Sequence, residues 1–546
     1  MKKINKSISL LLAIIMLLST LNLTACQEEN NGNNGTDDGD NGGAYVPVVD
    51  PVNDNYRTFY QIFVGSFSDG NGDGIGDLMG IVNHIDYLND GDVNLGNDLG
   101  VQGIWLSPIF ASPSYHKYDA KDYYSLDWRF GSMNVLKELI QLCHERNVKI
   151  IIDFAINHTS KEHEWFKEFV KARQNGDTEN KYYYYYTAVA SDEKQNGATY
   201  QKIAGCDYWY ECNFSGDMPE LDFDNPVVRE EMLNVAKFYL DLGIDGFRFD
   251  AVKYIYFGDT QKSVEFWEWY MDELTAYAPD IYCVGECWSG QQEIMQYYSA
   301  MNCFNFAMSG AEGSAASAAK GNSLNTFVKY IEYYQDEVAK ANPNGMPMQF
   351  LSNHDQDRIA GAFLLSGNMK MAANLYLLSP GSPTIYYGEE IGIRGSRGGA
   401  MTDANRRLAM LWGDGDSIKN PQGSTYPSEN QIITTVTSQL EDPNSMLNHY
   451  SKLIHIRNKY LAIARGDYNA VTTSHKNVAG YYVEYNGEIL GIFHNNSANQ
   501  ITVDLSKAVG IDGNTFLAVC DFVGNGSATL DGTTLTIDGY TSVILK

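Results

Sequence analysis

The chain has few cysteines and few basic residues for its length. It contains 8 cysteines in 546 residues, and 39 lysines and arginines against 68 aspartates and glutamates. So few cysteines in a long chain exclude a disulfide scaffold. The formal net charge of −29 argues against nucleic acid and anionic membrane surfaces as partners, because both attract basic proteins. A neutral substrate fits this charge better.

Long apolar runs are absent after the N-terminal segment, so no later stretch is expected to span a membrane. Three early lysines, the apolar run Ile8–Leu18 and Cys26 after small residues predict a signal peptide over residues 1–26. The cleavage region resembles the bacterial lipoprotein signal, which implies lipidation of Cys26. An ordinary secretory signal cleaved near Ala25 is the alternative. Both place the mature protein outside the cytoplasm, and the first anchors it to the cell surface.

The length of the chain exceeds what one hydrophobic core supports, so two or three domains are expected. With 44% hydrophobic and 20% charged residues, most of the chain should be globular. The exception is residues 27–55, which begin with a run of Asn, Gly, Asp and Glu. This run cannot bury enough apolar surface to offset chain entropy, so we expect a flexible tether ahead of a folded part.

Short apolar runs alternate with longer amphipathic stretches from residue 56 onward. Continuous apolar runs indicate strands buried on both faces of a parallel sheet. Candidate strands are Phe59–Phe67, Gly103–Pro108, Lys149–Ala155, Gly246–Asp250, Tyr282–Gly285, Met348–Ser352 and Thr384–Tyr387. Helix-like stretches such as Asn134–Glu145 and Arg229–Leu242 lie between them. Repeated strand–helix units predict an α/β fold, a parallel (β/α)8 TIM barrel, with an open doubly wound sheet as the alternative.

Two segments break this alternation. Residues 160–216 contain several glycines and five consecutive tyrosines, which predicts a domain inserted after the third strand. Residues 467–546 carry short apolar runs separated by Asn-Gly and Asp-Gly turns, which is typical of antiparallel strands. We therefore assign the barrel to residues 56–159 and 217–466, followed by a C-terminal β-sandwich domain.

Polar residues stand at the ends of four predicted strands. Asp153, the pair Arg248 and Asp250, Glu286, and His354-Asp355 take these positions. In a barrel these strand ends face one mouth, where active sites are built. Two carboxyl groups on opposite sides of a glycosidic bond, about 5–5.5 Å apart, can cleave it with retention.

Asp250 and Glu286 come from consecutive predicted strands, so they can reach that separation. Arg248 lies two residues before Asp250, on the same side of its strand, where its charge would keep Asp250 ionised. Glu286 needs a raised pKa to serve as an acid at neutral pH. For an isolated Arg-x-Asp pair, a structural salt bridge is the simpler interpretation.

Four segments resemble the signature regions of the alpha-amylase family of glycoside hydrolases. They are Asp153–His158, Gly246–Ala251, Gly285-Glu286 and Asn353–Asp355, in the family's order. The resemblance covers residue 56 to the C-terminus and implies the same barrel, inserted domain and C-terminal β domain. It also implies that Asp250 is the nucleophile, that Glu286 is the general acid/base, and that the third carboxylate, Asp355, holds the 2- and 3-hydroxyls of the sugar.

The resemblance implies further substrate contacts. Tyr118 would stack under the sugar, with Asp119 beside it, and both His158 and His354 would bond its hydroxyls. Arg358, like Arg248, would support the site. Lys253 and Trp288 are candidates for the leaving-group side, although residues of these types beside a catalytic strand could equally serve packing.

A glycine-rich acidic loop follows the first predicted strand. Oxygen donors at alternate positions, with glycines allowing a tight wrap, suit Ca²⁺. The ligands would be Asp69, Asn71, Asp73, the carbonyl of Ile75, and Asp77. The loop resembles an EF-hand opening but lacks its twelfth-position glutamate, and the family has a structural calcium loop here. An unoccupied Gly-Asp turn is the alternative, and the family's second calcium site is in doubt because Glu220 and Tyr254 depart from its pattern.

These features together predict an extracellular, retaining α-glucan hydrolase that acts on starch and maltodextrins as a monomer. Ala251 and Lys253 resemble members that cleave α-1,4 bonds, which predicts release of short malto-oligosaccharides. Asp119 and the predicted calcium loop resemble the glucosidase branch of the family. An exo-acting alpha-glucosidase, an oligo-1,6-glucosidase and a neopullulanase are therefore alternatives. An inactive glycan-binding or transporter-partner protein of the same fold would lack catalytic carboxylates, and all three are present.

Overall fold

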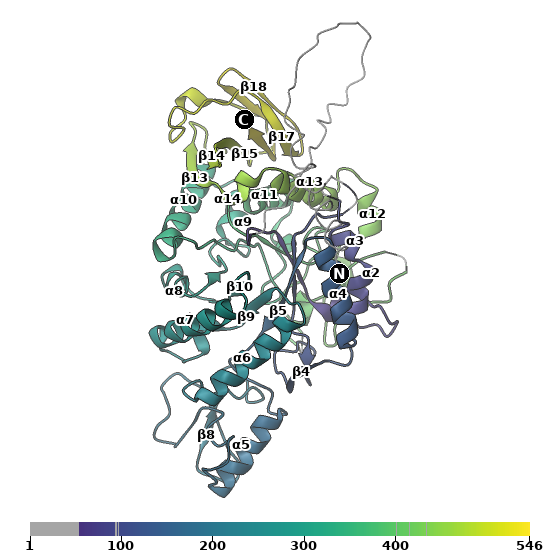
Figure 1. Cartoon of the computed structure of the whole chain (residues 1–546). Helices are drawn as coiled ribbons and strands as arrows, with labels where there is room; N and C mark the ends of the chain where they lie inside the picture. Colours follow the sequence, from purple (N-terminus) through teal and green to yellow (C-terminus); the bar gives the residue numbers. More distant parts are fainter. Residues whose placement is uncertain (1–53, 93–95, 97, 400, 414, 433) are drawn as a thin grey trace, which may run out of the picture. The chain divides into compact units, whose positions relative to one another are not determined.

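A ring of parallel strands lies at the centre of the protein (Figure 1). The computed structural model describes residues 54–92, 96, 98–399, 401–413, 415–432 and 434–546. Seven strands form one sheet in the order β11-β10-β9-β5-β2-β1-β12. Their bounds are β1 (Phe59–Ile62), β2 (Gly103–Leu106), β5 (Lys149–Phe154), β9 (Gly246–Phe249), β10 (Tyr282–Gly285), β11 (Asn302–Cys303) and β12 (Thr384–Tyr386). Parallel bridges from Met348 to Phe304 and from Phe350 to Thr384 place residues 348–350 between β11 and β12, which closes the ring.

The alternation of side chains along each strand builds two cores. Neighbouring residues of a strand point to opposite faces, so each strand contributes to the barrel interior and to the packing under the helices. The interior cluster consists of Phe59, Trp105, Ile151, Tyr282, Val284, Phe304, Met346, Met348 and Phe350. Residues one position away, such as Tyr60, Ile104 and Ile152, belong to the larger core under the helices.

Helices follow the strands and cover the ring. The helices in this part are α2 (Leu78–Asn83), α3 (Ile85–Leu88), α4 (Met133–Glu145), α6 (Pro226–Asp241), α7 (Thr260–Tyr277), α8 (Gln291–Tyr297), α9 (Ser314–Ala319), α10 (Leu324–Ala341), α11 (Ser366–Leu377), α12 (Val436–Leu440), α13 (Met446–Lys459) and α14 (Leu461–Arg465). In α4, the buried residues Leu136, Leu139, Ile140 and Cys143 recur at helical spacing, so one face packs inward. The predicted (β/α)8 barrel is confirmed.

Two predicted barrel strands differ in detail, and one strand of the ring was not predicted. The first ends at Ile62, because Val64–Ser66 turn into a short 3-10 helix. Met348–Ser352 makes isolated bridges and no continuous ladder. The two-residue strand Asn302–Cys303 was not predicted, since so short a run gives no periodic signal.

The chain between β5 and α6 forms a separate lobe with its own small sheet. It contains α5 (Glu164–Asn175) and the strands β6 (Ala188–Val189), β7 (Tyr200–Lys202) and β8 (Trp209–Glu211) in the order β6-β8-β7. Three tyrosines of the consecutive run, Tyr183, Tyr185 and Tyr186, are buried here. The guanidinium of Arg173 lies over the Tyr183 ring, 4.1 Å from its centroid. Before this lobe, the hairpin of β3 (Phe110–Ala111) and β4 (Asp122–Leu126) follows β2.

The last part of the chain forms two antiparallel sheets, as predicted. One has the order β13-β14-β15-β20-β17 and the other β16-β19-β18. Their bounds are β13 (Asp467–Thr472), β14 (Val478–Tyr485), β15 (Glu488–Asn495), β16 (Ile501–Asp504), β17 (Val519–Gly524), β18 (Ala528–Asp531), β19 (Thr534–Ile537) and β20 (Thr541–Leu545). These strands share an apolar core that includes Val471, Phe493 and Leu535.

Some predictions fall outside the described residues, namely the signal peptide, Cys26 and most of the tether. Within the described residues, none of the helices is both long and apolar enough to cross a membrane. The thiols of Cys206 and Cys212 are free.

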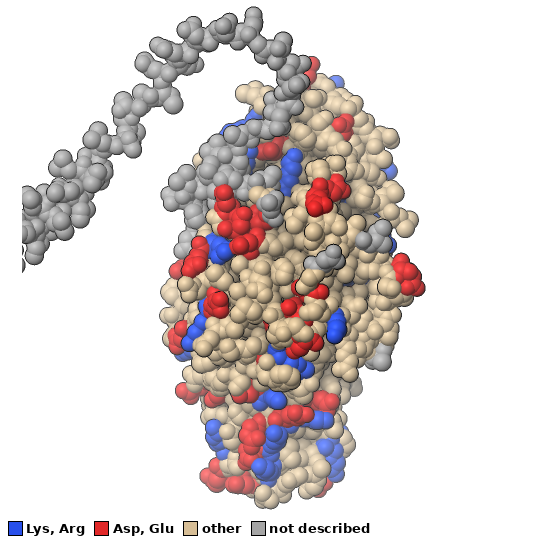
Figure 2. All heavy atoms as spheres, turned by 90° about the vertical axis from the view of Figure 1, so that its right-hand side faces the viewer, with Lys and Arg blue, Asp and Glu red and all other residues tan. Residues whose placement is uncertain are grey.

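On the face drawn in Figure 2, Lys and Arg side chains lie among Asp and Glu side chains and form no continuous basic patch.

Candidate active site

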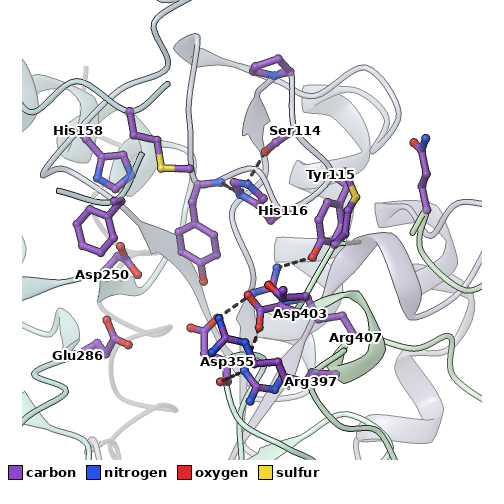
Figure 3. Close-up of a pocket in the computed structure, with 18 of the residues that line it drawn as sticks. Ser114, Tyr115, His116, His158, Asp250, Glu286, Asp355, Arg397, Asp403 and Arg407 are labelled. Carbon is purple, nitrogen blue, oxygen red and sulfur yellow. Dashed lines mark hydrogen bonds and ion pairs between the residues drawn. The ribbon is translucent and has the colours of Figure 1, made fainter. Parts of the chain in front are cut away.

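A pocket of about 750 Å³ lies at the carboxyl ends of the barrel strands. Its wall includes Asp250, which follows β9, Glu286, which follows β10, and Asp355, which follows the bridging segment 348–350 (Figure 3). Parallel strands bring these three carboxyl groups to one mouth although the sequence separates them widely.

One buried guanidinium connects the carboxylates of three strands. Arg248 is fully buried, and its Nη1 lies 2.7 Å from Asp153 Oδ1 and 2.7 Å from Asp250 Oδ1. Its Nη2 lies 3.4 Å from Glu286 Oε1. The register explains the arrangement, since Arg248 pairs with Asp153 on β5 and with Val284 on β10. Asp250 and Glu286 therefore flank a single cation.

Glu286 and Asp153, two of the carboxyl groups beside this guanidinium, resist ionisation. Burial raises the pKa of Glu286 to about 8, with the carboxylates of Asp250 and Asp355 adding to the rise and Arg248 opposing it. Burial likewise raises the pKa of Asp153 to about 6, against the opposing charge of Arg248. Glu286 thus carries a proton at neutral pH and can donate it, as a general acid must.

Asp355 has the opposite electrostatic character. Burial alone would raise its pKa, but the charges of His354, Arg407 and Arg248 outweigh burial and hold the pKa well below its usual range. Arg407 Nη2 lies 2.8 Å from Asp355 Oδ1, and His354 Nε2 lies 2.9 Å from Asp355 Oδ2. An ionised carboxylate at the pocket wall can accept hydrogen bonds from sugar hydroxyls.

Tyr118 and His354 form a stacked pair against the same wall. Their rings are 5.5 Å apart and nearly parallel, at 9°. The Tyr118 hydroxyl lies 2.8 Å from Asp153 Oδ2 and 2.6 Å from His354 Nε2. Gln61, on β1, lies 2.7 Å from His354 Nδ1 and fixes the ring from behind. The exposed edge of Tyr118 lines the pocket, so a sugar ring can pack there.

His158 lines the pocket as a neutral side chain. Burial lowers its pKa, and its Nε2 has no hydrogen-bond partner among the described residues. Phe214, from the lobe after β5, lies beside His158 with ring centroids 5.2 Å apart.

Besides Arg248, three residues that the family resemblance assigns to the site do not line the pocket: Asp119, His354 and Arg358. His354 is fully buried, and its Nε2 lies against the Tyr118 hydroxyl and Asp355, so the predicted direct bond to a sugar hydroxyl is not seen. Asp119 is buried within its own loop, where it accepts hydrogen bonds from Ser112 Oγ at 2.8 Å and from Ser114 Oγ. Arg358 is also buried, and it donates to the carbonyl oxygens of Tyr387 and Arg406. Arg358 therefore holds the loop that carries Arg407 and does not touch the pocket itself.

A smaller cavity of about 190 Å³ adjoins the main pocket on the side of Glu286. Phe214, Ala251, Lys253, Tyr254, Glu286 and Trp288 line it. Lys253 Nζ donates to the Trp288 carbonyl oxygen at 2.8 Å. Trp288 is 46% exposed and stacks on Phe306, with centroids 5.3 Å apart. This cavity offers an apolar surface beside Glu286.

Sequence reasoning missed Arg407 and Tyr115. The Arg407 guanidinium donates to Tyr115 Oη at 3.1 Å and to the His354 carbonyl oxygen at 3.0 Å, in addition to Asp355. The only sequence signal was an Arg-Arg pair after the last barrel strand, which carries no motif. Phe214 and Met218, from the lobe after β5, also line the pocket without a sequence signal.

The acidic loop after β1 wraps around Asp69. The carboxylate of Asp69 accepts the amides of Gly72 at 2.7 Å and Gly74 at 2.6 Å, and the hydroxyl of Ser417 at 2.6 Å. Within the described residues there is no group of three or more His, Cys, Asp or Glu side chains placed to hold a metal. The predicted donors are all oxygens of carboxylate, amide and carbonyl groups, the chemistry that Ca²⁺ prefers.

Comparisons with known proteins agree with this geometry. The family model described as alpha amylase, catalytic domain, matches residues 61–466. Alpha-amylase 3 of Dictyoglomus thermophilum is 34% identical over 436 residues, covering 79% of this chain and 83% of that protein. Oligo-1,6-glucosidase of Bacillus cereus is 27% identical over 510 residues, covering 79% and 88%.

A solved structure supports the same assignment. Eubacterium rectale Amy13B superposes with a TM-score of 0.83 at 34% identity, covering 91% of this chain and 97% of that one. The family match spans more than half of the chain, and three carboxylates of the matching segments meet in one pocket. The chain belongs to the alpha-amylase family of glycoside hydrolases.

Proposed function

We propose that the protein is an extracellular, retaining hydrolase that cleaves α-1,4 bonds in starch and maltodextrins and releases short malto-oligosaccharides. One observation carries the proposal. Arg248 holds Asp250 and Glu286 together, while burial keeps Glu286 protonated at neutral pH. Retaining cleavage needs a carboxylate nucleophile and a carboxylic acid on opposite sides of the glycosidic bond.

The proposed reaction follows from these positions. Glu286 donates its proton to the glycosidic oxygen while Asp250 attacks the anomeric carbon, which gives a covalent glycosyl-enzyme. Loss of that proton leaves Glu286 as a base that activates water for the second step. Asp355, kept ionised by Arg407 and His354, holds hydroxyls of the distorted sugar. Tyr118 packs against the ring.

The linkage and the mode of attack belong to the proposal. Ala251 and Lys253 resemble α-1,4-acting members, and they line the cavity next to Glu286. An alpha-glucosidase, an oligo-1,6-glucosidase or a neopullulanase is the alternative, favoured by the resemblance to the Bacillus cereus relative. With maltoheptaose, early release of mixed oligosaccharides supports internal cleavage, whereas glucose alone at the first time points contradicts it.

The mechanism is tested on the purified protein with starch. The wild type should release sugar whose reducing ends first appear as the α-anomer in proton NMR. Asp250→Asn and Glu286→Gln should each lose at least about 1,000-fold in kcat, on the order of 4 kcal/mol of transition-state stabilisation. First appearance of the β-anomer, or full activity in Asp250→Asn, would overturn the proposal.

The proposal also includes one bound Ca²⁺ and attachment of the enzyme to the cell surface. Asp69, Asn71, Asp73, the Ile75 carbonyl and Asp77 would hold one Ca²⁺ that stiffens the loop after β1. Lipidation of Cys26 would tether the enzyme outside the cell, where polymeric starch is found. Growth with labelled palmitate should label the wild type and not Cys26→Ser.

A further inference from the structure

The main pocket holds a concentration of arginine that the composition of the chain does not anticipate. Four arginines line it in a protein whose formal net charge is −29. Three of them are paired with carboxylates: Arg129 with Asp127, Arg406 with Asp357 and Asp403, and Arg407 with Asp355. The fourth is Arg397.

Arg397 is fixed at its backbone and free at its side chain. Its amide donates to Asp357 Oδ1 at 2.8 Å, and the same oxygen accepts from Arg406 Nε at 2.8 Å. The Arg397 guanidinium makes no hydrogen bond or ion pair with any of the described residues, and the residue is exposed. Figure 3 shows Arg397 on the side of the pocket that carries Asp355 and Arg407, across from Asp250 and Glu286.

The carboxylates that line the pocket already have other cationic partners. Asp355 is bound to Arg407, Asp403 to Arg406, and Asp250 to Arg248. A neutral glucan offers a guanidinium only hydroxyl groups. A phosphate or carboxylate offers paired oxygens that match its fork of N–H donors.

We propose that Arg397 recognises an oxyanion on a glucosyl unit of the α-glucan, close to the bond that is cleaved. The ligand class is a glucan with an anionic substituent, either a phosphate monoester or an oxidised, carboxyl-bearing unit. This inference rests on the proposed function, since it adds a charged substituent to the same substrate and the same pocket.

The test compares three dextrins of equal length: one neutral, one with a 6-phosphate on a single glucosyl unit, and one with a 6-carboxylate there. For each we would measure kcat/KM with the wild type, Arg397→Gln and Arg397→Lys. Arg394→Gln is the matched control, because Arg394 is exposed on the same loop and lies outside the pocket. Melting temperatures establish that each variant is folded.

In Arg397→Gln, the ratio of kcat/KM for anionic over neutral dextrin should fall about twofold to fivefold, the upper part of the range for an exposed ion pair. Arg397→Lys should retain part of the preference, and Arg394→Gln all of it. A fall in this ratio for the 6-phosphate dextrin, for the 6-carboxylate dextrin or for both identifies which anionic group Arg397 binds. An unchanged ratio in Arg397→Gln, or an equal fall in Arg394→Gln, overturns the inference. Failure of the wild type to cleave neutral dextrin would instead overturn the proposed function.

Discussion

The amide of Ala251 donates to Oε2 of Glu286 at 3.0 Å, which ties the residue after the proposed nucleophile to the proposed acid/base. Ala251 adopts φ 50°, in the left-handed region that disfavours residues with a Cβ. The Val252 amide adds a second bond, to the Glu286 carbonyl oxygen at 3.1 Å. The turn after β9 therefore sets the position of the proton donor on the next strand, and its strain falls at the reacting groups.

Ala251 is predicted to control linkage preference. It lines the cavity beside Glu286, so a larger side chain there changes the space on the leaving-group side. Ala251→Val should raise the ratio of kcat/KM for panose, cleaved at its α-1,6 bond, over maltotriose by at least about threefold. Ala251→Gly relieves the left-handed strain, so its melting temperature should be no lower than that of the wild type. It adds no bulk, so the kcat/KM ratio should stay unchanged. A ratio that moves equally in both variants would show that bulk is irrelevant.

The pH dependence of activity should report Glu286. The pKa of about 8 means that the protonated form, which the first step needs, is lost as pH rises through that value. We therefore expect kcat/KM on maltodextrin to fall tenfold per pH unit above about 8. In Glu286→Gln the residual activity should lose this basic limb, measured from pH 5 to 10. If the limb persists in that variant, another group is responsible.

A second buried carboxyl group should govern stability. Burial raises the pKa of Glu389 to about 8, while the hydroxyls of Tyr376 and Tyr450, at 2.8 and 3.0 Å, oppose the rise. An acid whose folded pKa exceeds its unfolded value binds more protons when folded, so stability falls as pH rises from about 4.5 to 8. The melting temperature of the wild type should fall across this window by more than that of Glu389→Gln. Equal slopes of melting temperature against pH in the wild type and in Glu389→Gln would exclude this role for Glu389.

The proposed calcium site in residues 69–77 gives a prediction about the stability of the protein. An ion that binds only the folded state stabilises it in proportion to the logarithm of its concentration. Adding millimolar Ca²⁺ after chelation should raise the melting temperature of the wild type by several degrees, and Asp69→Asn should abolish the shift. Glu429→Gln, an exposed acid elsewhere, should keep it. A shift of equal size in Asp69→Asn would place the ion at another site.

The parts of the site that the sequence revealed are those encoded locally. Asp250 and Glu286 directly follow buried strands, so the strand pattern alone brings them to one mouth. Arg407 reaches Asp355 across 52 residues and Tyr115 across 292 residues. Such contacts depend on how loops fold back over the barrel, and loops carry no periodicity to read. For the same reason the inward turn of Asp119 was not foreseen from its position after Tyr118.

Arg407 is predicted to be as important as the motif residues although no motif contains it. It is buried, it bonds Asp355 at 2.8 Å, and it contributes to the depressed pKa of that carboxyl. Arg407→Ala should lower kcat on maltodextrin by about 100-fold, a typical loss for one preorganised electrostatic contact. Arg407→Lys keeps the charge but not the fork of donors, so it should recover only part of the activity. Because a purely structural role would lower the melting temperature without a specific kinetic effect, both quantities are needed. A large fall in melting temperature with kcat unchanged in the folded fraction would mean that Arg407 serves packing. A reduced kcat with a melting temperature within a few degrees of the wild type would mean that Arg407 acts through the electrostatics of Asp355.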